Sequence, residues 1–323
     1  MSMMDAYLYT YAAHESEQAL CALELSELLG SFSVTPKSSP APSSRGLLFS
    51  ERAVNPDRSP FLTARLDVWF AASTVEELAL QAASLSLPEE MTFKVVYLKE
   101  SDACSYEEQR TRERSIGACI QGQARMKSPD VTFGLAATGG KWLLGELHLP
   151  PRQWLEHTSK PHNYSTGLSS RTARALVNIA VPRLEGTTFL DPCCGMGNVL
   201  IEALSMGLRA EGGDLNPLAV QGARVNLRHY GYGEDCVRIQ DMNDRSGRYD
   251  AAVLDLPYNV CSVLPEEEKI QMLRSLRRLT GRAVIVAPEP LETLLADTGW
   301  TVLRHVQTRK GTFTRDIWLC QSM

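Results

Sequence analysis

The chain has 323 residues, of which 44% are hydrophobic and 22% charged, and its formal net charge is −5. This length exceeds that of one ordinary domain and allows each of two domains a large core, so stability requires neither a disulfide framework nor a metal. The negative charge excludes a uniformly basic nucleic-acid-binding protein, although a local basic patch can still contact phosphates.

The eight cysteines include no Cys-x-x-Cys pair, and the six histidines do not cluster beside them. We therefore expect no metal site. Scattered thiols are typical of a reducing compartment, which predicts a cytoplasmic protein. The first ten residues lack the pattern of a signal peptide, and no apolar run is long enough to span a bilayer, so we expect no membrane partner.

The first half of the chain predicts strands and helices in no regular alternation. We expect strands at 6–11, 46–49, 63–70, 92–98, 131–135 and 141–147, and helices at 15–29, 74–85 and 105–123. The stretch 31–60 is rich in Ser, Pro and Arg and predicts mostly loops. This mixture predicts an α+β region, which we divide into a segment over 1–60 and a second region over 61–155.

The second half has a different rhythm, because strands and helices alternate. We expect strands at 187–191, 210–214, 236–240, 251–255, 282–287, 301–308 and 312–320, and helices at 172–181, 198–206, 217–230, 266–279 and 291–297. Several of these strands are continuous apolar runs, which is typical of a parallel sheet covered on both faces. The short link 309–311 predicts a final antiparallel hairpin. The pattern predicts an α/β domain over 160–323 with the layout of the Rossmann-like class I methyltransferases.

The first strand of this domain is followed by a loop with the sequence DPCCGMGN, residues 191–198. Small residues let the backbone approach a ligand, and the helix that follows offers free N–H groups. The loop lacks the third glycine of a dinucleotide fingerprint and the ending of a phosphate loop. An acid at the strand end suits the ammonium group of S-adenosylmethionine, although a simple tight turn is the alternative. Cofactor contacts are assigned to Asp191, Cys193, Gly195, Gly197 and Asn198.

Two further acids end the next two strands. Asp214 lies where a carboxylate can accept hydrogen bonds from both ribose hydroxyls, and Asn216 follows it. Asp241 ends the third strand, where an adenine amino group would lie. Each acid could instead cap a helix or a turn. Because ligands bind at the carboxyl edge of a parallel sheet, we add these three residues to the predicted cofactor site.

The strongest signal is the sequence DLPYN, residues 255–259, at the end of the fourth strand. It resembles the Asp/Asn-Pro-Pro-Tyr motif of amino-methyltransferases, with Leu256 in place of the first proline. The exocyclic amine of a base is a weak nucleophile because its lone pair is delocalised into the ring. A side-chain oxygen and a loop carbonyl can accept its two N–H bonds, an aromatic ring can stack on the base, and catalysis is then positioning and electrostatics. Catalytic roles are assigned to Asp255, Pro257, Tyr258 and Asn259.

From Lys160 onward the chain resembles the THUMP-containing tRNA guanine-N2 methyltransferases. The similar stretches are the lead-in helix at 171–178, the cofactor loop at 189–197 and the catalytic strand and loop at 249–258. The resemblance implies S-adenosylmethionine as methyl donor and the exocyclic N2 amine of guanosine in tRNA as acceptor. The same transfer to ribosomal RNA guanine, DNA adenine N6 or protein glutamine is the alternative, and an inactive RNA-binding protein is a minor one.

Upstream of this domain, residues 114–117 and 127–131 resemble the second half of a THUMP domain, an RNA-binding module that docks the acceptor end of tRNA. In that light the basic stretch 110–127 becomes a candidate for phosphate contacts, with a solvated helix face as the alternative. In the last strand, Arg315 resembles the arginine of the family's closing hairpin. We expect tRNA, or another structured RNA, as partner, bound by Arg110, Arg112, Arg114, Arg125, Lys127 and Arg315.

Overall fold

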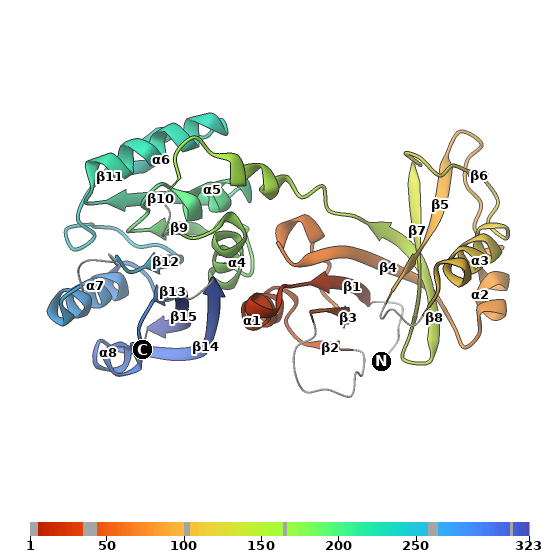
Figure 1. The fold of residues 1–323 in the computed structure, drawn as a ribbon, viewed down its shortest axis with the longest axis horizontal. Coiled ribbons are helices and arrows are strands. Elements are labelled where there is room, and N and C mark those ends of the chain that lie inside the picture. Colours follow the sequence, from red (N-terminus) through yellow and green to blue (C-terminus); the bar gives the residue numbers. More distant parts are fainter. Residues whose placement is uncertain are drawn as a thin grey trace. The chain divides into compact units, whose positions relative to one another are not determined.

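The computed structural model describes residues 6–34, 44–99, 104–163, 167–257, 264–310 and 313–322. The chain divides into two compact units (Figure 1). The first unit comprises Met1–Glu15 and Leu29–Pro151, and the second comprises Ser16–Leu28 and Arg152–Met323. Within the described part of the chain, no helix has the length and apolar character needed to cross a membrane.

The first unit is built on one eight-stranded sheet. Its order is β2 (Phe32–Val34), β3 (Arg45–Ser50), β1 (Tyr7–Ala12), β4 (Leu62–Ala72), β8 (Lys141–His148), β7 (Val131–Thr138), β5 (Thr92–Leu98) and β6 (Gln123–Ala124). Neighbours are antiparallel, except that β5 pairs in parallel with both β7 and β6. Two helices, α2 (Val75–Ala82) and α3 (Tyr106–Gly117), share a buried apolar core with β5, β7 and β8. This mainly antiparallel sheet with its two helices confirms the predicted α+β region.

Local sequence explains where the elements of this unit begin and turn. The Thr74 side chain accepts the Glu77 N–H at the start of α2, and Ser105 forms a capping box with Glu108 at the start of α3. Gly139 and Gly140 have φ values of 57° and 72°, and this left-handed pair makes the tight turn between β7 and β8. The strands predicted at 131–135 and 141–147 are confirmed, and together they form a hairpin.

The second unit is built on a seven-stranded sheet. Its order is β11 (Val237–Ile239), β10 (Arg209–Asp214), β9 (Thr188–Asp191), β12 (Ala251–Asp255), β13 (Arg282–Ala287), β15 (Phe313–Ser322) and β14 (Trp300–Lys310). The first five strands are parallel, whereas β15 runs antiparallel to both β13 and β14. The predicted parallel sheet with a closing antiparallel hairpin is confirmed.

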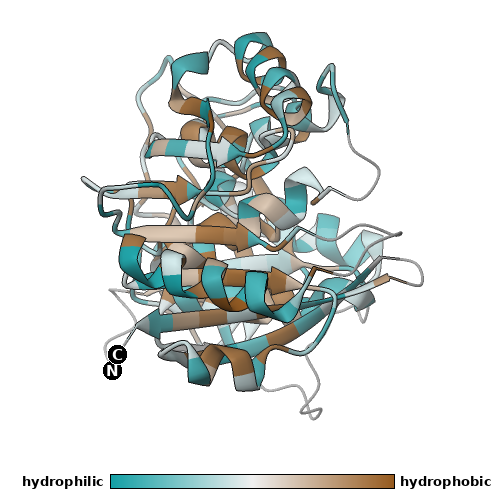
Figure 2. Cartoon of the chain, turned by 90° about the vertical axis from the view of Figure 1, so that its left-hand side faces the viewer, coloured by the Kyte–Doolittle hydropathy of each residue, from teal (hydrophilic) through white to brown (hydrophobic). Residues whose placement is uncertain are grey.

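Helices cover both faces of this sheet. They are α4 (Ser170–Ala180), α5 (Asn198–Ser205), α6 (Pro217–His229), α7 (Glu266–Leu279) and α8 (Glu292–Asp297), with the short helices η4 (Gln153–Ser159) and η5 (Glu234–Cys236). Leu254 and Ile285 are buried in the core that includes α7, and Val253, which points to the opposite face, is equally buried. Figure 2 shows the hydrophobic residues concentrated along the strands. Burial on both faces explains why these strands are continuous apolar runs.

One helix of the second unit comes from the N-terminal end of the chain. It is α1 (Gln18–Leu29), and its fully buried Glu24 accepts a hydrogen bond from Asn178 Nδ2 at 2.6 Å. Glu27 of the same helix pairs with Arg282 at 2.7 Å. The sequence could not reveal this docking, because Glu24 and Asn178 are 154 residues apart.

The domain boundaries therefore differ from those expected from the sequence. Residues 1–60 and 61–155 do not separate, because β1 on one side of the boundary pairs with β4 on the other. Helix α1 also leaves the N-terminal segment and joins the unit that was expected to begin at residue 160. Pairing between distant strands outweighed the change in local composition on which the boundary was based.

We predict that Glu24→Ala lowers the free energy of unfolding by ~1–3 kcal/mol, because the buried Asn178 amide loses this acceptor. Urea denaturation of the full chain measures the effect. Glu27→Ala is the matched control: its ion pair with Arg282 is 22% and 26% exposed, so its loss should cost at most about 1 kcal/mol. Equal costs for the two variants would contradict the buried anchor.

Candidate active site

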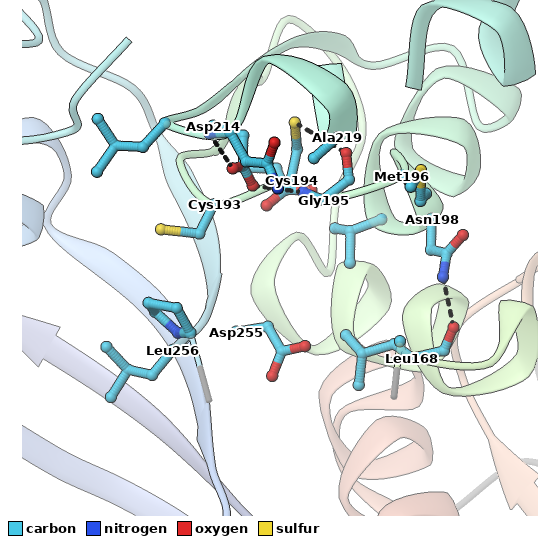
Figure 3. Close-up of a pocket in the computed structure, with 16 residues that line it drawn as sticks. Leu168, Cys193, Cys194, Gly195, Met196, Asn198, Asp214, Ala219, Asp255 and Leu256 are labelled. Atoms are coloured by element: carbon cyan, nitrogen blue, oxygen red, sulfur yellow. Dashed lines mark hydrogen bonds between the residues drawn. The ribbon is translucent and has the colours of Figure 1, made fainter. Parts of the chain in front are cut away.

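A pocket of about 360 Å³ lies at the carboxyl ends of β9, β10 and β12 (Figure 3). Its lining residues are Gly167, Leu168, Asp191, Cys193, Cys194, Gly195, Met196, Asn198, Val199, Asp214, Leu215, Asn216, Ala219, Asp255, Leu256 and Pro257. The carboxyl edge of a parallel sheet is the expected place for a ligand, and this volume is typical of a small-molecule site.

The glycine loop after β9 forms the upper wall of the pocket in Figure 3. Gly195 and Gly197 have φ values of 51° and 82°, in the left-handed region that favours glycine. The loop is closed by a hydrogen bond from Gly197 N–H to Cys194 C=O at 2.8 Å, and Cys194 N–H donates to Gly213 C=O at 2.9 Å. The two glycines of the motif are therefore required by the backbone, and Gly197 shapes the loop without lining the pocket.

Asp214 at the end of β10 connects this strand to the glycine loop. Its carboxylate accepts the N–H of Gly195 at 2.9 Å and that of Asn216 at 2.9 Å. Asn216 in turn accepts the Leu218 N–H at 3.0 Å and caps α6, and it also lines the pocket. Asp214 remains part of the pocket lining, where a ligand hydroxyl can reach it.

Asp191 and Asp255 end the neighbouring strands β9 and β12, and both line the pocket. Burial raises the pKa of Asp191 well above its ordinary value, and the charges of Asp255 and Asp214 raise it further. Burial likewise raises the pKa of Asp255 to about 7, while the charge of Arg315 opposes this shift. A positively charged group in the pocket would therefore stabilise the charged forms of both acids.

The Asp255 carboxyl group has unused hydrogen-bonding capacity. Its Oδ1 atom is buried and accepts no hydrogen bond from the described residues. In Figure 3 the group points into the space between the glycine loop and Leu168. A buried acceptor without a donor is costly, so this atom is suited to a ligand that brings an N–H group.

Leu256, which departs from the proline-rich motif, has a structural role in this protein. Its N–H donates to Val286 C=O at 3.0 Å, a bond that proline cannot make, and so extends the pairing of β12 with β13 by one residue. The Leu256 side chain is 3% exposed and belongs to the core that includes α7. Leu256 therefore fixes the end of β12 by a backbone hydrogen bond, whereas a proline would restrict only its own backbone.

The remaining residues of the predicted catalytic and cofactor sets have different outcomes. Pro257 lines the pocket, whereas Tyr258 and Asn259 lie outside the described residues. Asn198 lines the pocket and donates its Nδ2 to Leu168 C=O at 2.7 Å. Asp241 does not belong to the lining: β11 ends at Ile239, and the Asp241 carboxylate accepts the N–H of Asn243 at 2.8 Å in the following turn. Its expected contact with adenine is therefore replaced by a turn-capping role.

Of the basic residues expected to contact RNA in the first unit, Arg114, Arg125 and Lys127 are exposed. Arg110 is exposed too, but pairs with Glu113 at 2.8 Å. Arg112 is half-buried, with its guanidinium carbon 5.6 Å and 5.1 Å from the ring centroids of Tyr97 and Trp142. The exposed members keep their positive charge accessible, whereas Arg112 packs against aromatic rings.

Arg315, also expected to contact RNA, lies on β15 of the second unit and is only 6% exposed. Its positive charge opposes the rise that burial causes in the pKa of Asp255. The structure therefore makes Arg315 a poor candidate for broad phosphate contact. The sequence could not show this burial, because it depends on the position of β15 inside the sheet between β13 and β14.

Several lining residues were missed from the sequence. Leu215 and Ala219 follow Asp214 closely and could have been found by their position after the strand. Gly167 and Leu168 precede β9 in a segment that carries no sequence motif. They reach the pocket only through the fold of the chain.

The strand order, the glycine loop after the first strand and the acids at the carboxyl edge together define a Rossmann-like class I methyltransferase domain. Residues 158–287 match a family model described as RMKL-like, methyltransferase domain. This match confirms the methyltransferase domain predicted from the sequence.

Two of the relatives found by comparison share the same enzyme name. The chain is 30% identical over 194 residues to a tRNA (guanine(10)-N2)-dimethyltransferase of Methanothermobacter thermautotrophicus, covering 55% of this chain and 57% of the relative. It is 28% identical over 223 residues to the enzyme of the same name from Pyrococcus abyssi, covering 64% and 67%. The chain thus spans little more than half the length of the first relative. The predicted resemblance to the tRNA guanine-N2 methyltransferases is confirmed.

Among solved structures, the crystal structure of TrmN from Thermus thermophilus is 18% identical, with 98% of this chain and 100% of that chain covered and a TM-score of 0.49. The fold of the second unit follows independently from its own strand order.

We predict that Asp255→Asn stabilises the ligand-free protein more at pH 8 than at pH 5. The pKa of Asp255 is about 7 in the folded protein, above the ordinary 3.8, so its stabilising contribution is complete below about pH 4 and is lost as the pH rises through 7. Because a tenfold change in an ionisation constant corresponds to about 1.4 kcal/mol, the gain at pH 8 should exceed ~1 kcal/mol. Urea denaturation at both pH values measures it.

Asp250→Asn is the control for this experiment. Hydrogen bonds from Thr188 lower the pKa of Asp250, so its carboxylate stabilises the fold at high pH and its replacement should destabilise the protein there. A gain for Asp255→Asn that is independent of pH would refute the assigned ionisation.

We further predict that Leu256→Pro lowers the free energy of unfolding by ~1–3 kcal/mol, because Val286 C=O loses its donor. Thermal denaturation measures the loss, and Leu256→Ala serves as the comparison because it keeps the N–H while removing the buried side chain. The strand-end role is contradicted if hydrogen exchange at Leu256 is already fast in the unmodified protein.

Proposed function

We propose that this protein is an S-adenosylmethionine-dependent methyltransferase that transfers a methyl group to the exocyclic N2 amine of guanosine in tRNA. The observation that carries the proposal is the buried Asp255 Oδ1 at the end of β12, which accepts no hydrogen bond from the described residues and faces an acid-lined pocket. The names of the two archaeal relatives support the choice of tRNA guanosine.

The pocket residues fit the proposed cofactor. Asp191 would hold the positively charged ammonium group, and Asp214 would accept hydrogen bonds from the ribose hydroxyls. The glycine loop between them leaves room for close backbone approach, since Gly195 carries no side chain. When bound, the cofactor supplies an electrophilic methyl group on a sulfonium.

Asp255 would position the acceptor amine. Its free oxygen accepts an N–H of the base, which holds the nitrogen in place and directs its lone pair toward the methyl group. As the nitrogen–carbon bond forms and the carbon–sulfur bond breaks, the nitrogen loses a proton. With a pKa of about 7, Asp255 is a suitable acceptor for that proton near neutral pH.

The first unit would bind the RNA. Its exposed basic residues Arg114, Arg125 and Lys127 fit contacts to phosphates, and its α+β sheet fits the THUMP-like interpretation. A cytoplasmic location is part of the proposal and fits the free thiols of the seven cysteines that the structure describes.

Incubation of the full chain with bulk tRNA and labelled S-adenosylmethionine tests this function. Digestion to nucleosides and mass spectrometry should find the label in N2-methylguanosine. The same incubation is run separately with DNA, protein and ribosomal RNA. Label in methyladenine of DNA, in protein glutamine or in ribosomal RNA, with none in tRNA, would overturn the assignment.

We predict that Asp255→Ala reduces methyl transfer by roughly 10²-fold or more, because the amine loses its acceptor, while the cofactor dissociation constant changes little. Single-turnover transfer assays and calorimetric titration separate the two effects. Asp235→Ala, at an exposed position in η5, is the control and should keep both properties. Rapid transfer by the Asp255→Ala variant would disprove its role.

A further inference from the structure

A single buried amide on α6 connects two segments that wall the pocket. Asn226 is fully buried, and its Nδ2 donates to His162 C=O at 2.8 Å and to Met196 C=O at 2.9 Å. Its Oδ1 accepts the His162 N–H at 2.8 Å. Three of the four hydrogen bonds available to an asparagine amide are therefore made to the backbone of these two segments.

The two segments contribute to opposite parts of the pocket lining. Met196 belongs to the glycine loop, and His162 lies in the stretch leading toward Gly167 and Leu168, which also line the pocket. At the other end of this stretch, Leu168 C=O accepts Asn198 Nδ2 at 2.7 Å. The backbones of His162 and Leu168, which both precede β9, are thus each bonded to a side-chain amide.

The same face of α6 seats the glycine loop. Gly222 lies one helical turn before Asn226, and a Cβ atom on it would lie 2.3 Å from Met196 Sδ. A Cβ atom on Gly197 would lie 3.3 Å from Cβ of Ala223. Helix α6 therefore leaves space for the loop at Gly222 and Ala223 and fixes its backbone at Asn226.

We propose that Asn226 is a positioning residue for cofactor binding, which holds the glycine loop and the segment at His162 in the arrangement that forms the pocket. The inference rests on the proposed function, since it assumes that the pocket binds the cofactor. It adds a residue that touches neither cofactor nor substrate, and it explains why a fully buried asparagine occupies an otherwise apolar helix face.

Calorimetric titration of the full chain with S-adenosylhomocysteine tests the role. Asn226→Ala leaves three backbone groups of His162 and Met196 without these partners, so we expect the dissociation constant to rise roughly tenfold or more. Asn226→Asp keeps the size and the acceptor but loses both donated bonds, so it should weaken binding as well. Circular dichroism establishes that each variant is folded at the titration temperature.

Asn178→Ala is the matched control. Asn178 is equally buried and donates its Nδ2 to Glu24 of α1, but it is not among the described residues that line the pocket. We expect it to lower the melting temperature while leaving the dissociation constant within about twofold, a separation that a merely structural role of Asn226 would not produce.

The outcomes separate this inference from the proposed function. Binding by the wild-type protein, with unchanged affinity in folded Asn226→Asp, overturns the positioning role alone. Equal losses of affinity in the Asn226 and Asn178 variants also overturn it. Failure of the wild-type protein to bind the analogue would overturn the proposed function and this inference with it.

Discussion

The burial of Asp191 and Asp255 on neighbouring strand ends is the constraint on which the second unit depends. Two carboxyl groups in one buried site raise the free energy of their charged forms, as the raised pKa of each group shows. A cationic ligand rich in N–H and O–H donors removes this cost. The glycine loop, the cap on α6 and the strand end at Leu256 are the parts that fix these acids around one small volume.

Much of that support comes from distant parts of the chain. Helix α1 lies in sequence between β1 and the later strands of the first unit, yet Glu24 and Glu27 bond to α4 and β13 of the second unit. Asn226 bonds to His162, and Asn198 bonds to Leu168, which lines the pocket. The methyltransferase unit thus includes the segment Ser16–Leu28, which lies between two parts of the first unit in the sequence.

The sequence predicted the elements whose signal is local. Alternating helices and apolar strands fixed the second sheet, and the positions of Asp191, Asp214 and Asp255 after their strands placed them at one edge. The strand expected at 236–240 ends one residue earlier, at Ile239, and Asp241 is not among the described residues that line the pocket. The docking of α1, the burial of Arg315 and the bonds of Asn226 depend on contacts between distant residues, and no local pattern carries that information.

A crystal structure of the protein with S-adenosylhomocysteine tests the central claim most directly. We predict that the amino group of the analogue lies at Asp191 and its ribose hydroxyls at Asp214. Its sulfur should face Asp255 Oδ1, which accepts no hydrogen bond from the described residues. An analogue bound away from these acids, or with its sulfur turned from Asp255, would contradict it.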